Sequence, residues 1–570
     1  MSVPRFPRGA PAVLAALLSL AVAAAEPLPE TAPDPQPGDR GVVRTAIQGT
    51  QIEEIPVRYL ARQRDAVGPG YDLHLVQLEG PVAERVGVAA GMSGSPVYFA
   101  GRLIGALSYR LGALPIEAVA GVTPIEDIRR AAPRAASGIA SPIATPVQIG
   151  GLSAIARGWI EPQLESLGLR LVAGAAGSAA DGIATELRAG SPVGVALVLG
   201  DLSVAATGTV TLVEGDRVYA FGHPFLGTGR VELPMVAAEV IHTLADEAGS
   251  VKLARVGASV GAIVDDRLTA IVGIRGATAR MIPLGLHVRG RPDGEQTLRF
   301  EIARSQSLTP LLAALAVINS LVGSPGYEHE STAILSGRLR IRGYPDVPVE
   351  LAASSQGAQD PALAVAVRLQ QVLAALWRNP FSALDLDGID LDVTFGPGAR
   401  SYQLDGVHYD RAAVRPGARV SVTCSLRRYR GAVETRRVEI AVPVDVPHDV
   451  RLTIAVGPPD YIDQALGQPV GRRLRSSRDL GAAIEALSEL GSAHHLQVVL
   501  LGGTPGIVTR GLAYDRLPPT AEKLLGGAPA GRGSRTHASV LSRAEVVLDG
   551  PVEGGVVAAL ELEGAVLDVP

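Results

Sequence analysis

The sequence predicts a mainly β protein built from several domains, and three observations carry this prediction. A chain of 570 residues is longer than one hydrophobic core usually holds, so several domains are expected. Short runs rich in β-branched and aromatic residues recur between glycine-rich turns, which is the pattern of antiparallel strands. Hydrophobic residues make up 47% of the chain and charged residues 19%, a composition typical of packed globular proteins.

The N-terminus has the pattern of a secretory signal peptide over residues 1–25. Arg5 and Arg8 precede an apolar run over residues 10–25, which ends in three alanines. An anchor helix is the weaker alternative, because this run is shorter than the ~20 apolar residues that span a bilayer. We therefore expect an exported mature chain, located in the periplasm, the cell envelope or the medium, with no transmembrane segment.

Composition excludes several classes of function. The net charge is −5 and no basic block is present, so nothing supports nucleic-acid binding. Cys424 is the only cysteine, which excludes an intramolecular disulfide and a cysteine zinc site. No cofactor or metal is expected. Only Lys252 and Lys523 of the 52 basic residues are lysines, which we interpret as coding bias. Residues 26–37 are a proline-rich linker.

A serine-containing turn follows strand-like runs over residues 42–59 and 71–78. It reads Gly91-Met92-Ser93-Gly94-Ser95-Pro96 and leads into a hairpin over residues 97–109, broken at Ala100-Gly101. A nucleophilic serine needs backbone N–H groups aimed at the oxyanion, and here the N–H groups of Gly91 and Ser93 are candidates. Glycine at 91 and 94 allows a close backbone approach. The alternative is a tight turn without chemistry.

A serine hydroxyl also needs a base, and the chain holds 10 histidines. After a linker over residues 133–150, strand-like runs over residues 202–213 and 217–221 lead directly into Gly222-His223, which makes His223 the preferred base. His74 is second, but alternation along its strand favours a solvent-facing position. An expected helix over residues 235–248 carries His242. The adjacent His494 and His495 should point to opposite faces of a strand, which makes a poor metal site.

The C-terminal half is expected to hold accessory domains. Residues 291–388 form a mixed α/β segment with helices over residues 309–322 and 360–377, each with start and stop signals. Alternating runs over residues 389–450 favour an immunoglobulin-like sandwich. Residues 451–570 combine one helix with several strands, which predicts an α+β domain.

The serine turn and the following hairpin resemble the nucleophile segment of trypsin-like serine peptidases. Gly-Met-Ser-Gly-Ser-Pro more closely resembles the stage IV sporulation protein B family of serine peptidases, and Gly222-His223 and Lys252-Leu253-Ala254-Arg255 match that family's histidine segment. The resemblance covers about residues 38–290. It implies a double β-barrel, Ser93 as nucleophile with Ser95 as its neighbour, and His223 as base.

This chain departs from the family in the order of its segments. The resemblance implies a serine half over residues 38–132 and a histidine half over residues 151–290, whereas the family has the histidine barrel first. We infer a circular permutation of the half-barrels, since catalytic groups are defined by geometry and not by chain order.

The group that orients the histidine is open. The family has Asp-Pro before its serine turn, where this chain has Glu79-Gly80-Pro81, so Glu79 is the first candidate. Asp72, Asp265 and Asp266 are the alternatives. The resemblance implies limited proteolysis of a protein partner, including self-cleavage. A non-catalytic exported scaffold or binding protein that retains a degenerate barrel is the second hypothesis.

Overall fold

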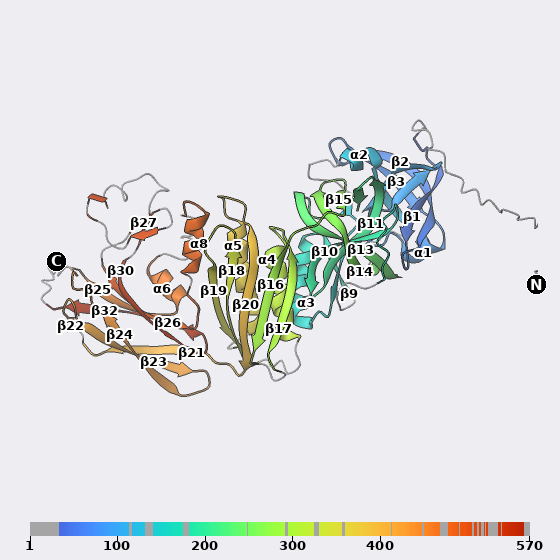
Figure 1. Ribbon diagram of the computed structural model, residues 1–570. Helices are drawn as coiled ribbons and strands as arrows, with labels where there is room; N and C mark the ends of the chain where they lie inside the picture. Colours follow the sequence, from blue (N-terminus) through green and yellow to red (C-terminus); the bar gives the residue numbers. More distant parts are fainter. Residues whose placement is uncertain are drawn as a thin grey trace, which may run out of the picture.

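The computed structural model contains two closed barrels, a layered α/β part and a two-sheet unit, which follow one another along the chain (Figure 1). The predicted mainly β, barrel-containing fold is confirmed. The predicted signal peptide and most of the proline-rich linker lie outside the described residues. These are residues 34–563 except 113–116, 131–140, 175–181, 248, 291–293, 324–329, 356–359, 412, 447–449, 468–476, 490, 504–506, 510–511, 515–517, 519, 522–533 and 537.

The first barrel closes in the order β4-β1-β2-β3-β6-β5, with every neighbouring pair antiparallel. Ala100 and Gly101 turn the β4–β5 hairpin with positive φ angles of 47° and 77°, the geometry that tight hairpin turns require. The hairpin predicted from this dipeptide is confirmed. The elements of this part are β1 (Arg40–Ala46), β2 (Ile52–Gly68), β3 (Tyr71–Leu78), α1 (Pro81–Val86), β4 (Pro96–Phe99), β5 (Arg102–Arg110), β6 (Val119–Pro124), α2 (Ile125–Arg130) and β7 (Ser141–Pro142).

The second barrel closes in the order β10-β13-β14-β15-β12-β11, again antiparallel throughout. The helix expected over residues 235–248 is wrong, because β13 covers most of it and pairs with β14 along its length. Strand pairing overrides the helical propensity of the local sequence here. The strands are β8 (Thr145–Gly150), β9 (Leu169–Gly174), β10 (Pro192–Gly200), β11 (Val204–Glu214), β12 (Arg217–Ala220), β13 (Gly229–Leu244), β14 (Val251–Asp266) and β15 (Ile271–Arg275).

The sheet of the second barrel continues without a break into the middle of the chain. Strand β10 pairs with β17, and the sheet then runs through β16, β20 and β18 to β19. The two predicted helices are confirmed as α4 and α5, and the Asp360 carboxylate caps α5 by accepting the Leu363 N–H. The elements are α3 (Ala154–Ser166), β16 (Met281–Arg289), β17 (Gln296–Ala303), α4 (Thr309–Val322), β18 (Ser331–Ile341), β19 (Val347–Ser354), α5 (Pro361–Trp377) and β20 (Leu386–Pro397).

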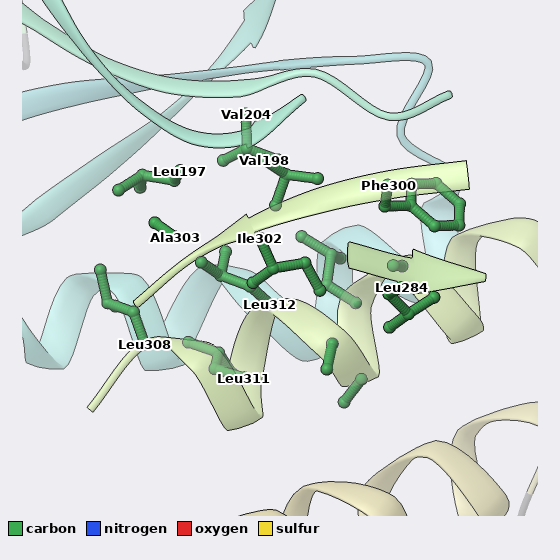
Figure 2. Close-up of a cluster of buried hydrophobic side chains, with 14 of the residues drawn as sticks. Leu197, Val198, Val204, Leu284, Phe300, Ile302, Ala303, Leu308, Leu311 and Leu312 are labelled. Atoms are coloured by element: carbon green, nitrogen blue, oxygen red, sulfur yellow. The ribbon is translucent and has the colours of Figure 1, made fainter. Parts of the chain in front are cut away.

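One hydrophobic core joins the second barrel to this middle part. Figure 2 shows Leu197 and Val198 of β10 facing Ile302 of β17, with Leu312 of α4 on the other side. All four are at most 1% exposed. The second barrel therefore packs as one body with the segment that follows it.

The C-terminal part of the chain contains two sheets around a shared core and a small three-stranded sheet, β28-β27-β29, whereas its helix α8 packs on the core of the middle part. The four-stranded sheet has the order β24-β23-β21-β31 and the five-stranded sheet the order β22-β32-β25-β26-β30. The elements are β21 (Tyr402–Tyr409), β22 (Ala413–Val414), β23 (Arg419–Arg428), β24 (Val433–Ala441), β25 (Leu452–Gly457), α6 (Pro459–Ala465), α8 (Leu480–Ser488), β26 (His495–Gly502), β27 (Ile507–Thr509), β28 (Leu512–Tyr514), β29 (Ser534–Arg535), β30 (Ser539–Val547), β31 (Val552–Glu553) and β32 (Val556–Leu562).

These boundaries differ from the predicted domains. The boundary expected at residue 389 falls inside β20, which belongs to the middle sheet. The segments 389–450 and 451–570 also share one core, because strands from both contribute to each sheet. No helix in the described part of the chain is long and apolar enough to cross a membrane.

Candidate active site

The serine turn belongs to the first barrel but is held by β11 of the second. The Thr209 N–H donates to the Ser93 carbonyl at 2.9 Å, and the Thr209 hydroxyl donates to the Gly91 carbonyl at 2.9 Å. The Thr211 hydroxyl donates to the Gly94 carbonyl at 2.8 Å. These three bonds fix the backbone on both sides of Ser93 to the opposite barrel.

Glycine at position 94 is required by this packing. Its φ is 92°, a region that side chains disfavour, and a Cβ there would lie 2.0 Å from the Thr209 carbonyl oxygen and 2.5 Å from the Phe221 nitrogen. The approaching backbone is that of the second barrel, two residues before His223.

The histidine segment is held in turn by the first barrel. Phe221 and Gly222 both have positive φ, of 71° and 70°, which turns the chain sharply after β12. The Thr123 hydroxyl donates to the Gly222 carbonyl at 2.8 Å, and a Cβ on Gly222 would lie 3.1 Å from that of Ser108. Each barrel therefore forms hydrogen bonds to a loop of the other barrel, and Ser93 and His223 both lie at the interface between the two barrels.

The Ser93 hydroxyl and the His223 Nε2 atom are buried and have no hydrogen-bond partner among the described residues. Ser93 is 0% and His223 1% exposed. Within the described residues, neither the Ser93 hydroxyl nor His223 Nε2 forms a hydrogen bond, so the two are not bonded to each other. Leaving a buried polar group unpaired costs about 1–3 kcal/mol, and such groups in a folded protein call for an explanation.

The His223 ring is oriented by a backbone carbonyl. Its Nδ1 donates to the Pro224 carbonyl at 2.7 Å, which leaves Nε2 as the acceptor nitrogen. Burial lowers the pKa of His223 to about 4, against the opposing effect of the Pro224 and Ile143 carbonyls. The ring is therefore neutral at pH 7 and able to take a proton on Nε2.

Two backbone N–H groups of the serine turn, those of Gly91 and Ser93, are also free of hydrogen bonds to the described residues. The N–H groups of Met92, Gly94 and Ser95 each donate to a nearby carbonyl. Those of Gly91 and Ser93 donate to no group among the residues that the structure describes, although both residues are buried. Free donors at these positions match the predicted oxyanion hole, because an oxyanion needs preorganised N–H groups next to the attacking hydroxyl.

No family model, curated protein or solved structure matches this chain.

Three of the predicted acids are paired with arginines. Glu79 lies 2.8 Å from Arg58, Asp72 lies 2.9 Å from Arg62, and Asp265 lies 2.8 Å from Arg267. No carboxylate in the described part of the chain is hydrogen-bonded to His223, whose Nδ1 is occupied by Pro224. The structure thus replaces the expected acid with a backbone carbonyl.

Asp266 acts one step away from the histidine. It is 1% exposed and accepts the N–H groups of Phe225 and Leu226 at 2.8 and 2.7 Å. Burial raises its pKa, and these backbone bonds oppose the rise. Asp266 therefore orders the loop after His223 and Pro224, which makes it a positioning residue.

The other histidine predictions need correction. His74 is 4% exposed and not solvent-facing; its Nδ1 is hydrogen-bonded to the Tyr59 hydroxyl at 3.0 Å and its ring packs against the Tyr59 ring. His242 lies exposed on strand β13 and not on a helix.

His494 and His495 do not diverge, since His494 precedes β26 and strand alternation does not apply to it. Their ring centroids are 4.5 Å apart. Together with Glu350 they offer ligand atoms that lie within 4.8 Å of one another. The pair that the sequence marked as a poor metal site is therefore closer to a metal-ligand geometry than alternation predicted.

Lys252 is the residue whose role the sequence interpretation missed. It is 3% exposed, its ammonium nitrogen donates to the Thr45 hydroxyl at 2.7 Å, and Thr45 is bonded to the Ser95 hydroxyl at 2.9 Å. Burial lowers the pKa of Lys252 to about 7. The aliphatic part of the Lys252 side chain packs on Gly91, so this residue supports the serine turn.

Proposed function

We propose that this protein is an exported serine endopeptidase that cleaves a protein partner at few sites, with Ser93 as nucleophile and His223 as base. One observation carries the proposal. A buried hydroxyl without a partner and a buried neutral imidazole nitrogen without a partner lie at one interface, beside two unused N–H groups of the serine turn. The resemblance to stage IV sporulation protein B peptidases supports the same reaction class.

The chemistry follows from the roles of these atoms. Ser93 Oγ attacks the carbonyl carbon of a peptide bond while its proton moves to His223 Nε2. The N–H groups of Gly91 and Ser93 bind the oxyanion. His223 then gives the proton to the leaving amine, an acyl-enzyme remains, and a water molecule, deprotonated by the same nitrogen, hydrolyses it. Before the first step Oγ and Nε2 must approach each other, since they are not bonded in the resting structure.

The Pro224 carbonyl makes this a slow enzyme. It holds the correct tautomer of His223, as a carboxylate would, but carries no negative charge to stabilise the imidazolium. Removing the orienting acid of a Ser-His-Asp triad lowers kcat by about 3 × 10⁴-fold. Turnover near that reduced level suits limited cleavage of one partner and not general digestion.

The test is labelling of the folded full-length chain with a fluorophosphonate, which reacts only with an activated serine. We expect labelling of the wild type, loss of labelling in Ser93→Ala, and at least about a hundredfold slower labelling in His223→Ala, as expected for loss of a general base. Ser95→Ala is the matched control, because Ser95 lies in the same turn but bonds to Thr45 and the Met92 carbonyl. Labelling that persists in Ser93→Ala contradicts the proposal.

The burial of Ser93 and His223 favours a second candidate function, a non-catalytic scaffold or binding protein that retains a degenerate barrel. Ser93 is 0% and His223 1% exposed, and a barrel kept only as a scaffold would show the same burial. On that hypothesis the folded wild type, Ser93→Ala and His223→Ala all fail to label.

A further inference from the structure

Strand β5 passes the serine turn along one edge, and three different partners share that edge. Residues 102–106 pair with β4, and Leu107 exchanges hydrogen bonds with the serine turn, through Gly94 and Ser95. Beyond Leu107 the edge is taken by β7, in which Pro142 lies opposite Tyr109 and Ser141 opposite Arg110. The edge next to the nucleophile is thus occupied by a short extended segment of the chain itself.

The next residue brings this segment to the catalytic groups. The Ile143 N–H donates to the Ser108 carbonyl at 2.9 Å, which continues the pairing by one residue. Its side chain is 2% exposed and lies in the same buried cluster as Met92 and Leu107. Its carbonyl is near enough to the His223 ring to act on that ring as a hydrogen-bond acceptor.

The segment then crosses to the other side of the nucleophile. The Pro146 ring lies 3.3 Å from where a Cβ on Gly91 would stand, so residues 143–146 run from the base to the first residue of the predicted oxyanion hole. A peptide substrate has to follow the same path, with its backbone on a strand edge and a carbonyl between nucleophile and oxyanion donors.

We infer that residues 141–146 occupy the substrate groove as an intramolecular pseudosubstrate, with Ile143 in the position of the residue whose carbonyl is attacked. This inference rests on the proposed function. It assigns the edge of β5 at Ser108–Arg110 as the substrate-binding strand, and the substrate as an extended peptide with an aliphatic residue at the Ile143 position.

The bound arrangement is unproductive. The Ile143 carbonyl accepts no hydrogen bond from Gly91 or Ser93, whose N–H groups stay unused among the described residues, and it faces the base. While the segment fills this edge of β5, a substrate peptide cannot bring its carbonyl to Ser93 Oγ. The resting enzyme is latent, which accounts for two buried reactive atoms without partners.

The experiment weakens the segment without touching the reacting groups. Ile143→Ala removes the apolar anchor, and we expect the fluorophosphonate to label it about tenfold faster than the wild type, because a larger fraction of molecules has the groove open. Ile143→Val retains the anchor and should label at nearly the wild-type rate. Equal rates for all three proteins overturn the pseudosubstrate and leave the proposed function standing, whereas no labelling of any folded variant overturns the proposed function.

A second measurement needs no substitution. The Ile143 amide should be protected from hydrogen exchange in the free wild type, because it is bonded to Ser108. Once Ser93 carries the fluorophosphonate group, the segment should be displaced and this protection should fall by about tenfold or more. Unchanged protection after labelling contradicts the inference, even where Ile143→Ala fails to fold.

Discussion

Lys252 places an amine in the buried interface between the barrels, in a chain that otherwise uses arginine. Only two of its 52 basic residues are lysines. A guanidinium stays charged at any physiological pH, whereas an amine can lose its proton when it is buried. Coding bias explains why the basic residues are mostly arginines, but it does not explain the lysine at position 252. The rarity of lysine therefore marked this buried position in the sequence.

This amine makes stability depend on pH. Burial lowers the pKa of Lys252 from 10.5 to about 7, so between these values the unfolded chain binds more protons than the folded one. The free energy of unfolding should rise with pH over that window, by up to about 1.4 kcal/mol per pH unit. In Lys252→Met the rise should disappear, and the protein should be more stable than the wild type below pH 7.

Urea unfolding at pH 6, 7.5 and 9 measures this slope. Lys252→Arg is the matched control: it keeps a permanent charge and should be the least stable variant at pH 9, with no rise of its own. A slope that persists in Lys252→Met contradicts the role of this amine.

Other residues show where sequence reasoning ends. Ser93 and His223 could be singled out because each follows a local signal, a glycine-rich turn or the end of a strand. The partner of His223 could not, since the group that orients it is the Pro224 backbone carbonyl, which no side-chain motif encodes. The acids that the sequence offers for this role have other partners: three form ion pairs with arginines, and Asp266 accepts N–H groups of the loop after His223.

At the level of elements, local signals succeeded and long-range pairing did not. The β4–β5 hairpin was predicted because its turn, Ala100-Gly101, is written in two adjacent residues. Strand β13 was missed because alanine, leucine and glutamate give residues 235–248 helical propensity, while its strand state depends on β14, which follows in the chain.

The contact between the serine turn and the loop that carries His223 gives a prediction at this scale. In Gly94→Ala the new methyl group meets the Thr209 carbonyl oxygen at 2.0 Å, so the serine turn must leave β11. We expect fluorophosphonate labelling to be lost and the free energy of unfolding to fall by about 3 kcal/mol, the sum of backbone strain and lost interface bonds. Thermal unfolding and labelling rates of the same samples measure both.

Gly112→Ala separates strain from contact. Gly112 also has a positive φ, of 81°, but nothing lies within 4 Å of the position a Cβ would take. This variant should lose only the strain, about 1 kcal/mol, and keep its labelling. Equal losses in the two variants contradict the close packing of the loops.

At the scale of the whole molecule, the predicted domains and the cores do not coincide. Composition shifts and proline-rich stretches mark loops, but they do not tell which sheet the next strand joins. Strands β16 and β17 extend the sheet of the second barrel, and β20 returns to pair with β16 in parallel. Pairing of this kind is decided between distant segments, so the expected boundaries at 290 and 389 cut through continuous structure.

A truncated chain tests this directly. A chain that ends at residue 290, the end of the predicted peptidase part, loses β17 and α4, which cover Leu197 and Val198 of the second barrel. It also loses Asn319, whose side chain accepts the Ser153 N–H at 2.9 Å. Burying an aliphatic side chain stabilises a fold by about 1.5–3 kcal/mol, and losing several such contacts exceeds the stability of a typical domain.

We therefore expect the chain ending at 290 to aggregate or to unfold without a cooperative transition. A chain ending at residue 400 keeps β16 to β20 with α4 and α5 and loses only α8 of this core, so it should melt cooperatively, at a lower temperature than the full-length protein, and retain its labelling rate. Circular dichroism melting curves and labelling of the two chains decide the matter. If the shorter chain melts cooperatively and labels at the full-length rate, the barrels form a separate domain and the middle sheet is only attached to them.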